Sequence, residues 1–174
     1  MSVHHPGELA ALRELLAEWA ARREGQVVVV AEDRGLDHGQ LCWGVLAHGA
    51  TPLVGPTCRC RSRGWHSIPH SDRMMHERLG VRVPVADAEG WVAHTLGQEL
   101  VYGSFRSVES ARVLAAPLVE LLGPDADWRA NGYAAHPPPS GNRHWSSVTP
   151  YTFDAALVGI GAGWTVVLVS TGED

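Results

Sequence analysis

The chain has 174 residues, of which 45% are hydrophobic and 19% charged, and its formal net charge at pH 7 is -5. All fourteen Lys and Arg positions are arginine, so the chain contains no lysine. Protein kinases, phosphate-loop nucleotide hydrolases, pyridoxal-phosphate enzymes and serine/lysine hydrolases each need a lysine side chain, and these classes are excluded. The acidic balance argues against a nucleic-acid-binding module, which concentrates positive charge on one face.

Length and cysteine usage indicate one soluble domain. A chain of this size can bury a full core, so residues 1–174 are expected to form a single globular domain. No apolar stretch reaches the roughly 20 residues that a membrane helix needs, and Met1 to Pro6 lack a cationic and then apolar leader. The three cysteines, an odd number, suit a reducing compartment. We therefore expect a cytoplasmic protein without a membrane partner.

The first predicted element is a helix over 7–23. Pro6 suits a first turn, Gly25 is a stop signal, and Glu18 and Arg22 are spaced for an exposed ion pair. The apolar positions expected to face the core are Leu9, Leu12, Leu15, Leu16 and Trp19.

Two strands and a long irregular segment are predicted next. Val27 to Val30 is a β-branched run typical of a buried strand, and the apolar content of 41–47 predicts a second strand despite Gly44. Thr51 to Pro69 contains prolines, glycines and arginines without a sustained period, which indicates a loop.

Three helices are predicted in the middle of the chain. Ser71 is an N-cap for a short helix that ends at Gly80, and Asp87 is a cap for another that reaches Leu96. A longer helix covers 108–122, and Pro117 is expected to kink or split it.

The last quarter combines a long loop with a hairpin. Asp125 and Asp127 indicate a turn, and Asn131 to Pro150 is a loop rich in Pro, Gly and Ser. Two apolar strands, 153–160 and 164–169, then flank Gly161-Ala162-Gly163 and predict a hairpin near the middle of a sheet. The whole pattern predicts an α+β fold, a single layered domain with an N-terminal helix, a central and mostly antiparallel sheet, and a C-terminal β-hairpin.

One cluster has the side chains of a zinc site. Cys58, Cys60, His66 and His70 are the ligand types that build tetrahedral zinc centres. The single residue between the two cysteines does not fit the common finger spacing, and thiols beside surface histidines explain the cluster equally well. We expect no cofactor, with zinc as the alternative.

Signals for catalysis are weak. The chain has no Gly-x-Ser-x-Gly elbow, and Cys42 lies in an apolar run that indicates core packing. Gly159-x-Gly161-x-Gly163 has the wrong spacing for a dinucleotide fingerprint and only eleven residues after it. These signals favour a protein without catalytic activity and leave a small enzyme as the alternative.

Signals for partner binding lie in the loops. Tryptophan and arginine are the usual energetic anchors of protein interfaces, and Trp65 and Trp145 fall in predicted loops. Pro137 to Pro139 restrict the backbone that leads to Arg143, His144 and Trp145, which lowers the entropy lost on binding. The predicted partner-binding residues are Trp145, Arg143, His144, His136 and Trp65.

The segment from Trp145 through Thr152-Phe153-Asp154 to the acidic end Gly172-Glu173-Asp174 resembles small bacterial proteins of the immunity type. The resemblance covers about residues 145–174. It implies a compact, non-catalytic protein that neutralises a toxin made by the same cell.

The expected function is thus the binding of a protein partner, with a basic toxin domain as the partner that the resemblance implies. Complementary charge would speed the encounter with such a partner. The alternative is a small enzyme or a metal- or ligand-binding protein that uses the loops 58–76 and 136–145 as one site.

Overall fold

The computed structural model describes residues 6–22, 25–49, 53–54, 68–97, 108–132, 146–151 and 153–172. The helices are α1 (Pro6–Ala21), α2 (His38–His48), α3 (Asp72–Arg78), α4 (Val85–Gly97) and α5 (Val108–Leu122). The strands are β1 (Gln26–Glu32), β2 (Val81–Val83), β3 (Asp127–Ala130), β4 (Phe153–Gly161) and β5 (Trp164–Gly172). They form one sheet in the order β1-β5-β4-β3-β2, with antiparallel pairing throughout. The predicted α+β class is confirmed.

The C-terminal hairpin of β4 and β5 occupies the centre of the sheet, as predicted. The two strands pair from Phe153 opposite Gly172 to Gly161 opposite Trp164. Ala162 and Gly163 make the turn with φ values of 48° and 82°. Two successive positive φ angles match the right-handed twist of the flanking strands, which makes this a tight hairpin turn.

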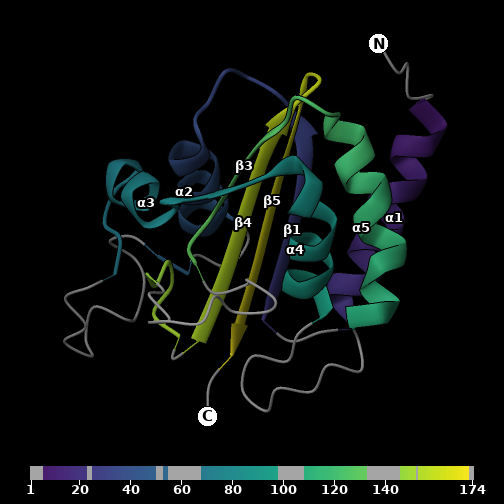
Figure 1. The fold of residues 1–174 in the computed structure, drawn as a ribbon. Helices are drawn as coiled ribbons and strands as arrows, with labels where there is room; N and C mark the ends of the chain where they lie inside the picture. Colours follow the sequence, from purple (N-terminus) through teal and green to yellow (C-terminus); the bar gives the residue numbers. More distant parts are fainter. Residues whose placement is uncertain are drawn as a thin grey trace.

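Helices cover both faces of the sheet, with α2 and α3 on one side and α1, α4 and α5 on the other (Figure 1). Alternate side chains of β5 pack into two different cores, one on each face of the sheet. Val166 and Leu168 belong to the core under α4 and α5, whereas Val167 and Val169 belong to the core under α2. An antiparallel sheet can leave one face to water, but strands that are apolar at every position require cover on both faces.

Gly159 is required by packing. Trp128 of β3 is fully buried, and a Cβ atom on Gly159 would lie 2.6 Å from its ring and 2.6 Å from the Leu122 side chain. The glycine therefore makes room for the largest side chain in the core.

The strand predicted over 41–47 is wrong, because this segment belongs to α2. Asp37 supplies an N-cap, and the buried residues His38, Cys42 and Leu46 recur every four positions. That spacing places them on one face of a helix. The seven-residue apolar run was too short to distinguish a strand from a helix, and the cap decides it.

The turn predicted at Asp127 is also wrong, because Asp127 opens β3 and pairs opposite Ile160 of β4. Asp125 does lie in the turn between α5 and β3. The short strands β2 and β3 pair with each other, with Val83 opposite Trp128. β3 does alternate, with Trp128 and Ala130 buried and its polar residues half-buried, but three or four residues are too few for such a pattern to predict a strand.

The predicted helices over 71–80 and 87–96 are confirmed in outline. The side chain of Ser71 caps α3 by accepting a hydrogen bond of 3.3 Å from the backbone N–H of Met74. Helix α4 begins at Val85, so Asp87 lies in its first turn and does not cap it.

Helix α5 runs continuously through Pro117, so the prediction of a split is wrong. A proline removes the hydrogen bond to the carbonyl of the residue four positions earlier, here Val113. Val113 is 73% exposed, which places the lost bond on the side of the helix that faces water. Hydration of the carbonyl can replace it.

Helix α1 is rotated from the expected orientation. Leu16 is 2% exposed and belongs to the core, and Leu9, Leu12 and Trp19 pack against it. Leu15 is 52% exposed, so its predicted burial is wrong. The ion pair of Glu18 with Arg22 is confirmed at 3.6 Å. None of the described helices is long and apolar enough to cross a membrane.

Candidate functional site

Helices α2 and α3 cross in close contact, and the crossing gathers several charged side chains. Gly39 makes the contact possible, because a Cβ atom on it would lie 2.6 Å from the carbonyl oxygen of Asp72 and 2.6 Å from the backbone nitrogen of His76. The start of α2 thus lies directly against α3. Any larger residue at position 39 would force the two helices apart.

Asp37 begins α2 through a capping box. Its carboxylate accepts a hydrogen bond of 2.9 Å from the backbone N–H of Gln40. The side chain of Gln40 in turn accepts a bond of 3.1 Å from the backbone N–H of Asp37. The two bonds satisfy backbone donors that the helix itself leaves free.

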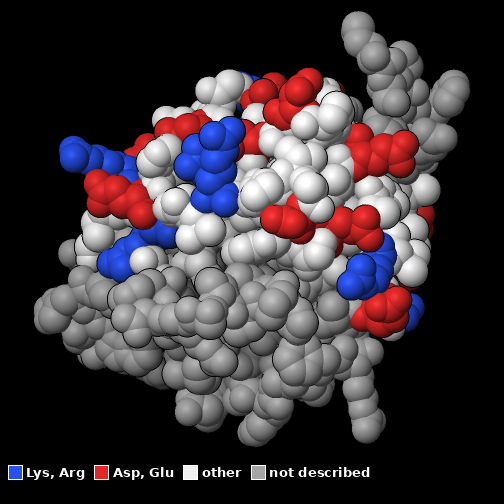
Figure 2. Space-filling view, viewed as in Figure 1, with Lys and Arg blue, Asp and Glu red and all other residues white. Residues whose placement is uncertain are grey.

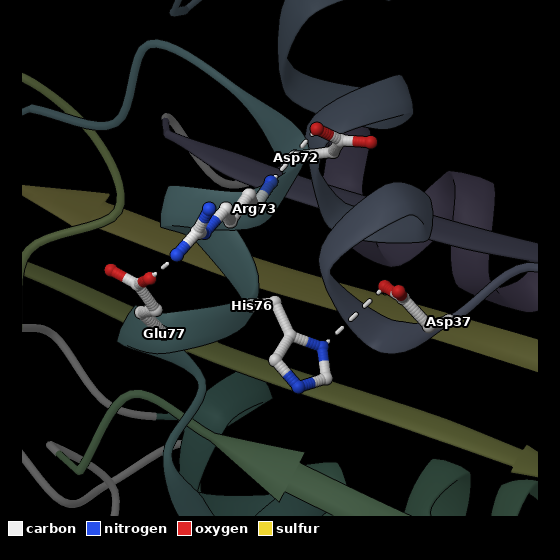
Figure 3. A pocket seen from close by; sticks show the side chains of 5 residues that line it. All are labelled: Asp37, Asp72, Arg73, His76 and Glu77. Carbon is white, nitrogen blue, oxygen red and sulfur yellow. Dashed lines mark hydrogen bonds and ion pairs between the residues drawn. The ribbon is translucent and has the colours of Figure 1, made fainter.

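An open depression of about 330 Å³ lies at this crossing (Figure 3). Its lining residues are Asp37, Asp72, Arg73, His76 and Glu77. His76 points toward Asp37, with 3.6 Å between Nδ1 and Oδ1, and Arg73 points toward Glu77, with 3.4 Å between Nε and Oε1.

The pKa of Asp37 reflects these contacts. Burial raises the pKa of its carboxyl, but the hydrogen bond from Gln40, the charge of His76 and a bond from the backbone of Gly39 outweigh it. The pKa therefore lies below the ordinary value for aspartate. Because the side chains of His76 and Asp37 are 60% and 52% exposed, their ion pair is screened by water and contributes little to stability.

The chemistry available in the depression is limited to proton exchange and charge pairing. A histidine oriented by a carboxylate is the usual arrangement of a general base. The five lining residues, however, include no hydroxyl or thiol that such a base would activate. We interpret the depression as a charged surface feature between two packed helices.

A second histidine of α2 joins this helix to the sheet. His38 is 7% exposed, and its Nε2 donates a hydrogen bond of 3.0 Å to the backbone carbonyl of Asp127. The carboxylate of Asp127 lies 3.4 Å from Nε of Arg129 and 3.8 Å from Nε of Arg82. The hydrogen bond from His38 fixes the start of α2 beside the start of β3, so His38 has a structural role.

Cys42 packs in the core under α2. Its thiol is fully buried in α2, and burial, followed by the negative charge of Asp154, raises the pKa of the thiol well above its ordinary value. A thiol that stays protonated is not a nucleophile. This result agrees with the expectation that Cys42 packs in the core.

Asp154 of β4 is the centre of a buried polar network. Its Oδ2 accepts hydrogen bonds from the backbone N–H groups of Val148 (2.9 Å) and Thr149 (2.7 Å) and from the Thr149 hydroxyl (2.8 Å). Its Oδ1 accepts a bond of 2.8 Å from the side-chain amide of Asn131. Asp154 and Thr149 are 0% exposed. Burial of a carboxylate is unfavourable unless such donors compensate it.

Asn131 extends the network to the end of β3. Its side-chain oxygen accepts a bond of 3.0 Å from the N–H of Ala156, which fixes it against β4. Its backbone carbonyl accepts a hydrogen bond of 3.1 Å from the backbone N–H of Ser146. Its side-chain amide donates a hydrogen bond of 3.3 Å to the backbone carbonyl of Ser146. We call Asn131, Ser146, Val148, Thr149 and Asp154 the Asn131–Asp154 clamp. It holds together the two chain positions that flank segment 133–145.

Most predicted site residues lie outside the described residues. This holds for the partner-binding residues Trp65, His136, Arg143, His144 and Trp145 and for the zinc ligands Cys58, Cys60 and His66. The remaining predicted ligand, His70, is exposed just before the cap of α3. Within the described part of the chain, no group of three or more His, Cys, Asp or Glu side chains is arranged to hold a metal ion.

The sequence contained one usable signal that was missed. Asp37 and Gln40 have the spacing of a capping box, which would have placed a helix start at position 38. The meeting of Asp37 with His76 and the burial of Asp154 have no local signal, because both depend on contacts between distant parts of the chain.

Comparison with known proteins adds no family. No family model matches the sequence, and no similar curated protein or solved structure was found. Function must therefore be inferred from contacts within this chain.

Proposed function

We propose that this protein binds and sequesters a protein partner through segment 133–145, which carries His136, Arg143, His144 and Trp145. The observation that supports the proposal is the Asn131–Asp154 clamp. It ties the chain at both ends of the segment to the central strand β4. Loops positioned by a rigid scaffold are the usual carriers of binding residues.

The clamp depends on a fully buried carboxylate, that of Asp154. Removal of a carboxylate from water costs several kcal/mol before new hydrogen bonds offset it. Four of the donors to Asp154 come from residues that flank the segment, namely Asn131, Val148 and Thr149. Fixed ends reduce the freedom that the segment loses when it binds, and this favours affinity.

Charge indicates the kind of partner. The chain has 14 arginines against 19 aspartates and glutamates, a formal net charge of -5 at pH 7. Figure 2 shows carboxylates along the top of the visible face and over its helical right side. An acidic scaffold accelerates the encounter with a basic partner.

The resemblance of residues 145–174 to immunity-type proteins favours a toxin domain of the same cell as that partner. Asp154, the last residue of the Thr-Phe-Asp pattern, is the buried carboxylate of the clamp. The pattern therefore includes the carboxylate that accepts the hydrogen bonds of the clamp. We infer a cytoplasmic protein that neutralises the toxin by binding, without catalysis.

Co-expression with the product of the neighbouring gene tests the proposal, with cell growth and calorimetric titration as readouts. The Arg143→Ala/Trp145→Ala variant should keep the melting temperature and weaken the complex by about 2 kcal/mol, which is about thirtyfold in Kd. The matched control is Leu15→Ala/Arg22→Ala, which truncates one exposed side chain of α1 and one in the turn directly after it.

Two results would reject this assignment. If the double variant binds as tightly as the parent, segment 133–145 is not the binding surface. If Trp145→Ala alone lowers the free energy of unfolding by several kcal/mol, Trp145 is a core residue.

A further inference from the structure

β1 is one edge of the sheet, and half of its backbone groups point away from the neighbouring strand. Thr171 donates a backbone bond of 2.8 Å to the carbonyl of Gly25, and Asp33 donates one of 2.8 Å to the carbonyl of Gly163. These bonds show that the backbone N–H and C=O groups of the odd-numbered residues in this segment point toward β5. In an antiparallel strand, the backbone N–H and C=O groups of successive residues point alternately toward one neighbouring strand and away from it. The groups that point outward from the sheet edge therefore belong to Gln26, Val28, Val30 and Glu32.

Arg13 of α1 occupies this edge. Its Nε and Nη2 donate bonds of 3.2 and 3.0 Å to the outward carbonyl of Val30. The guanidinium also lies 5.6 Å from the centroid of the Trp164 ring, which gives a cation–π contact. Within the described part of the chain, no other side chain bonds to the outward groups of β1.

We propose that the outward edge of β1 is a pairing surface for β1 of a second copy of this chain, and that Arg13 keeps it closed. Four consecutive valines without proline make the strand a strong candidate for pairing with another strand. A charged side chain over an edge strand is a common device against such pairing. The proposal does not depend on the function proposed above.

The register of β1 is self-complementary. In an antiparallel pair centred on Val29, Val28 lies opposite Val30 of the second copy and Gln26 lies opposite Glu32. Like charges do not face each other, and the outward groups meet in hydrogen-bonded pairs. The pair needs the carbonyl of Val30, so strand pairing and the Arg13 contact exclude each other.

Light scattering over a concentration series tests the proposal with the full chain. The parent should stay at the mass of one chain, 18.8 kDa, whereas Arg13→Ala and Arg13→Gln should approach twice that mass as concentration rises. The matched control is Arg22→Ala, which removes an exposed arginine of the same chain region that pairs only with Glu18 among the described residues. It should remain monomeric.

A second substitution identifies the surface. Val28→Pro removes an outward N–H and leaves the pairing with β5 intact, because proline is tolerated where the missing N–H faces solvent. Added to Arg13→Ala, it should restore the monomer. The proposal is overturned if both Arg13 variants stay monomeric, if the double variant still associates, or if the parent already forms a dimer.

Discussion

The side-chain amide of Asn131 donates a hydrogen bond of 2.8 Å to the carboxylate of Asp154, a fully buried group 23 positions later in the chain. This bond joins the end of β3 to the start of β4. The same carboxylate holds Val148 and Thr149, so one side chain fixes the chain on both sides of segment 133–145. Stability of the fold and the positions of these flanking residues are therefore coupled through Asp154.

Asp154→Ala should lower the free energy of unfolding by about 3 kcal/mol or more, because it leaves several buried donors without an acceptor. Asp125→Ala is the matched control, since Asp125 is exposed in a turn and its loss should cost less than about 0.5 kcal/mol. Urea unfolding measures both. A cost below about 1 kcal/mol for Asp154→Ala would show that the clamp does not stabilise the fold.

The two neighbouring leucines of α1 should respond very differently to truncation. Leu16→Ala should cost about 2–5 kcal/mol because Leu16 is 2% exposed and leaves a cavity. Leu15→Ala should cost less than about 0.5 kcal/mol because Leu15 is 52% exposed. Equal losses in urea unfolding would mean that α1 is rotated from the orientation described here.

Gly39 and Gly44 offer a second matched pair within one helix. Gly39→Ala should destabilise the protein by about 1–3 kcal/mol, because the added methyl group meets the backbone of Asp72 and His76. Nothing lies within 4 Å of a Cβ atom on Gly44, so Gly44→Ala should stabilise the helix by about 0.5–1 kcal/mol. Opposite shifts in melting temperature are expected. A stabilising Gly39→Ala would contradict the close crossing of α2 and α3.

Asp37 should make stability depend on pH in the acid range. Since contacts with Gln40 and His76 outweigh burial and hold its pKa below the ordinary value, the folded state prefers the ionised carboxylate. This contribution is present above the ordinary pKa and is lost as the pH falls through the folded pKa. Asp37→Asn keeps a capping side chain but has no charge to lose.

The measurement is the free energy of unfolding of both proteins at neutral pH and near pH 3. The advantage of the parent over Asp37→Asn should be present at neutral pH and shrink in acid. An advantage that grows in acid would reverse the sign of the pKa shift.

Cys42 should be inert to thiol reagents in the folded protein. Its buried thiol has a raised pKa, so thiolate is scarce and the sulfur is inaccessible. In a Cys58→Ser/Cys60→Ser background, labelling of Cys42 should follow the rate of opening and become fast in urea. Fast labelling under native conditions would show that α2 opens locally.

The sequence by itself determined the elements whose signals are local. The apolar runs on both sides of Gly161-Ala162-Gly163 specify a hairpin, and an uninterrupted apolar strand must be covered on both faces. The helix over 108–122 and the Ser71 cap are likewise confirmed, since apolar period and capping act within a few residues.

Only the tertiary structure decided the rest. The capping box of Asp37 and Gln40 is a local signal for the start of α2, but the close approach of Gly39 to α3 is set only by the tertiary structure. Leu15 and Leu16 are equally apolar, and only the position of α1 against the sheet determines which one is buried. The contact of Asp154 with Asn131 depends on the antiparallel pairing of β3 with β4. Such contacts join residues that are distant along the chain, and neither periodicity nor composition encodes which distant residues will meet.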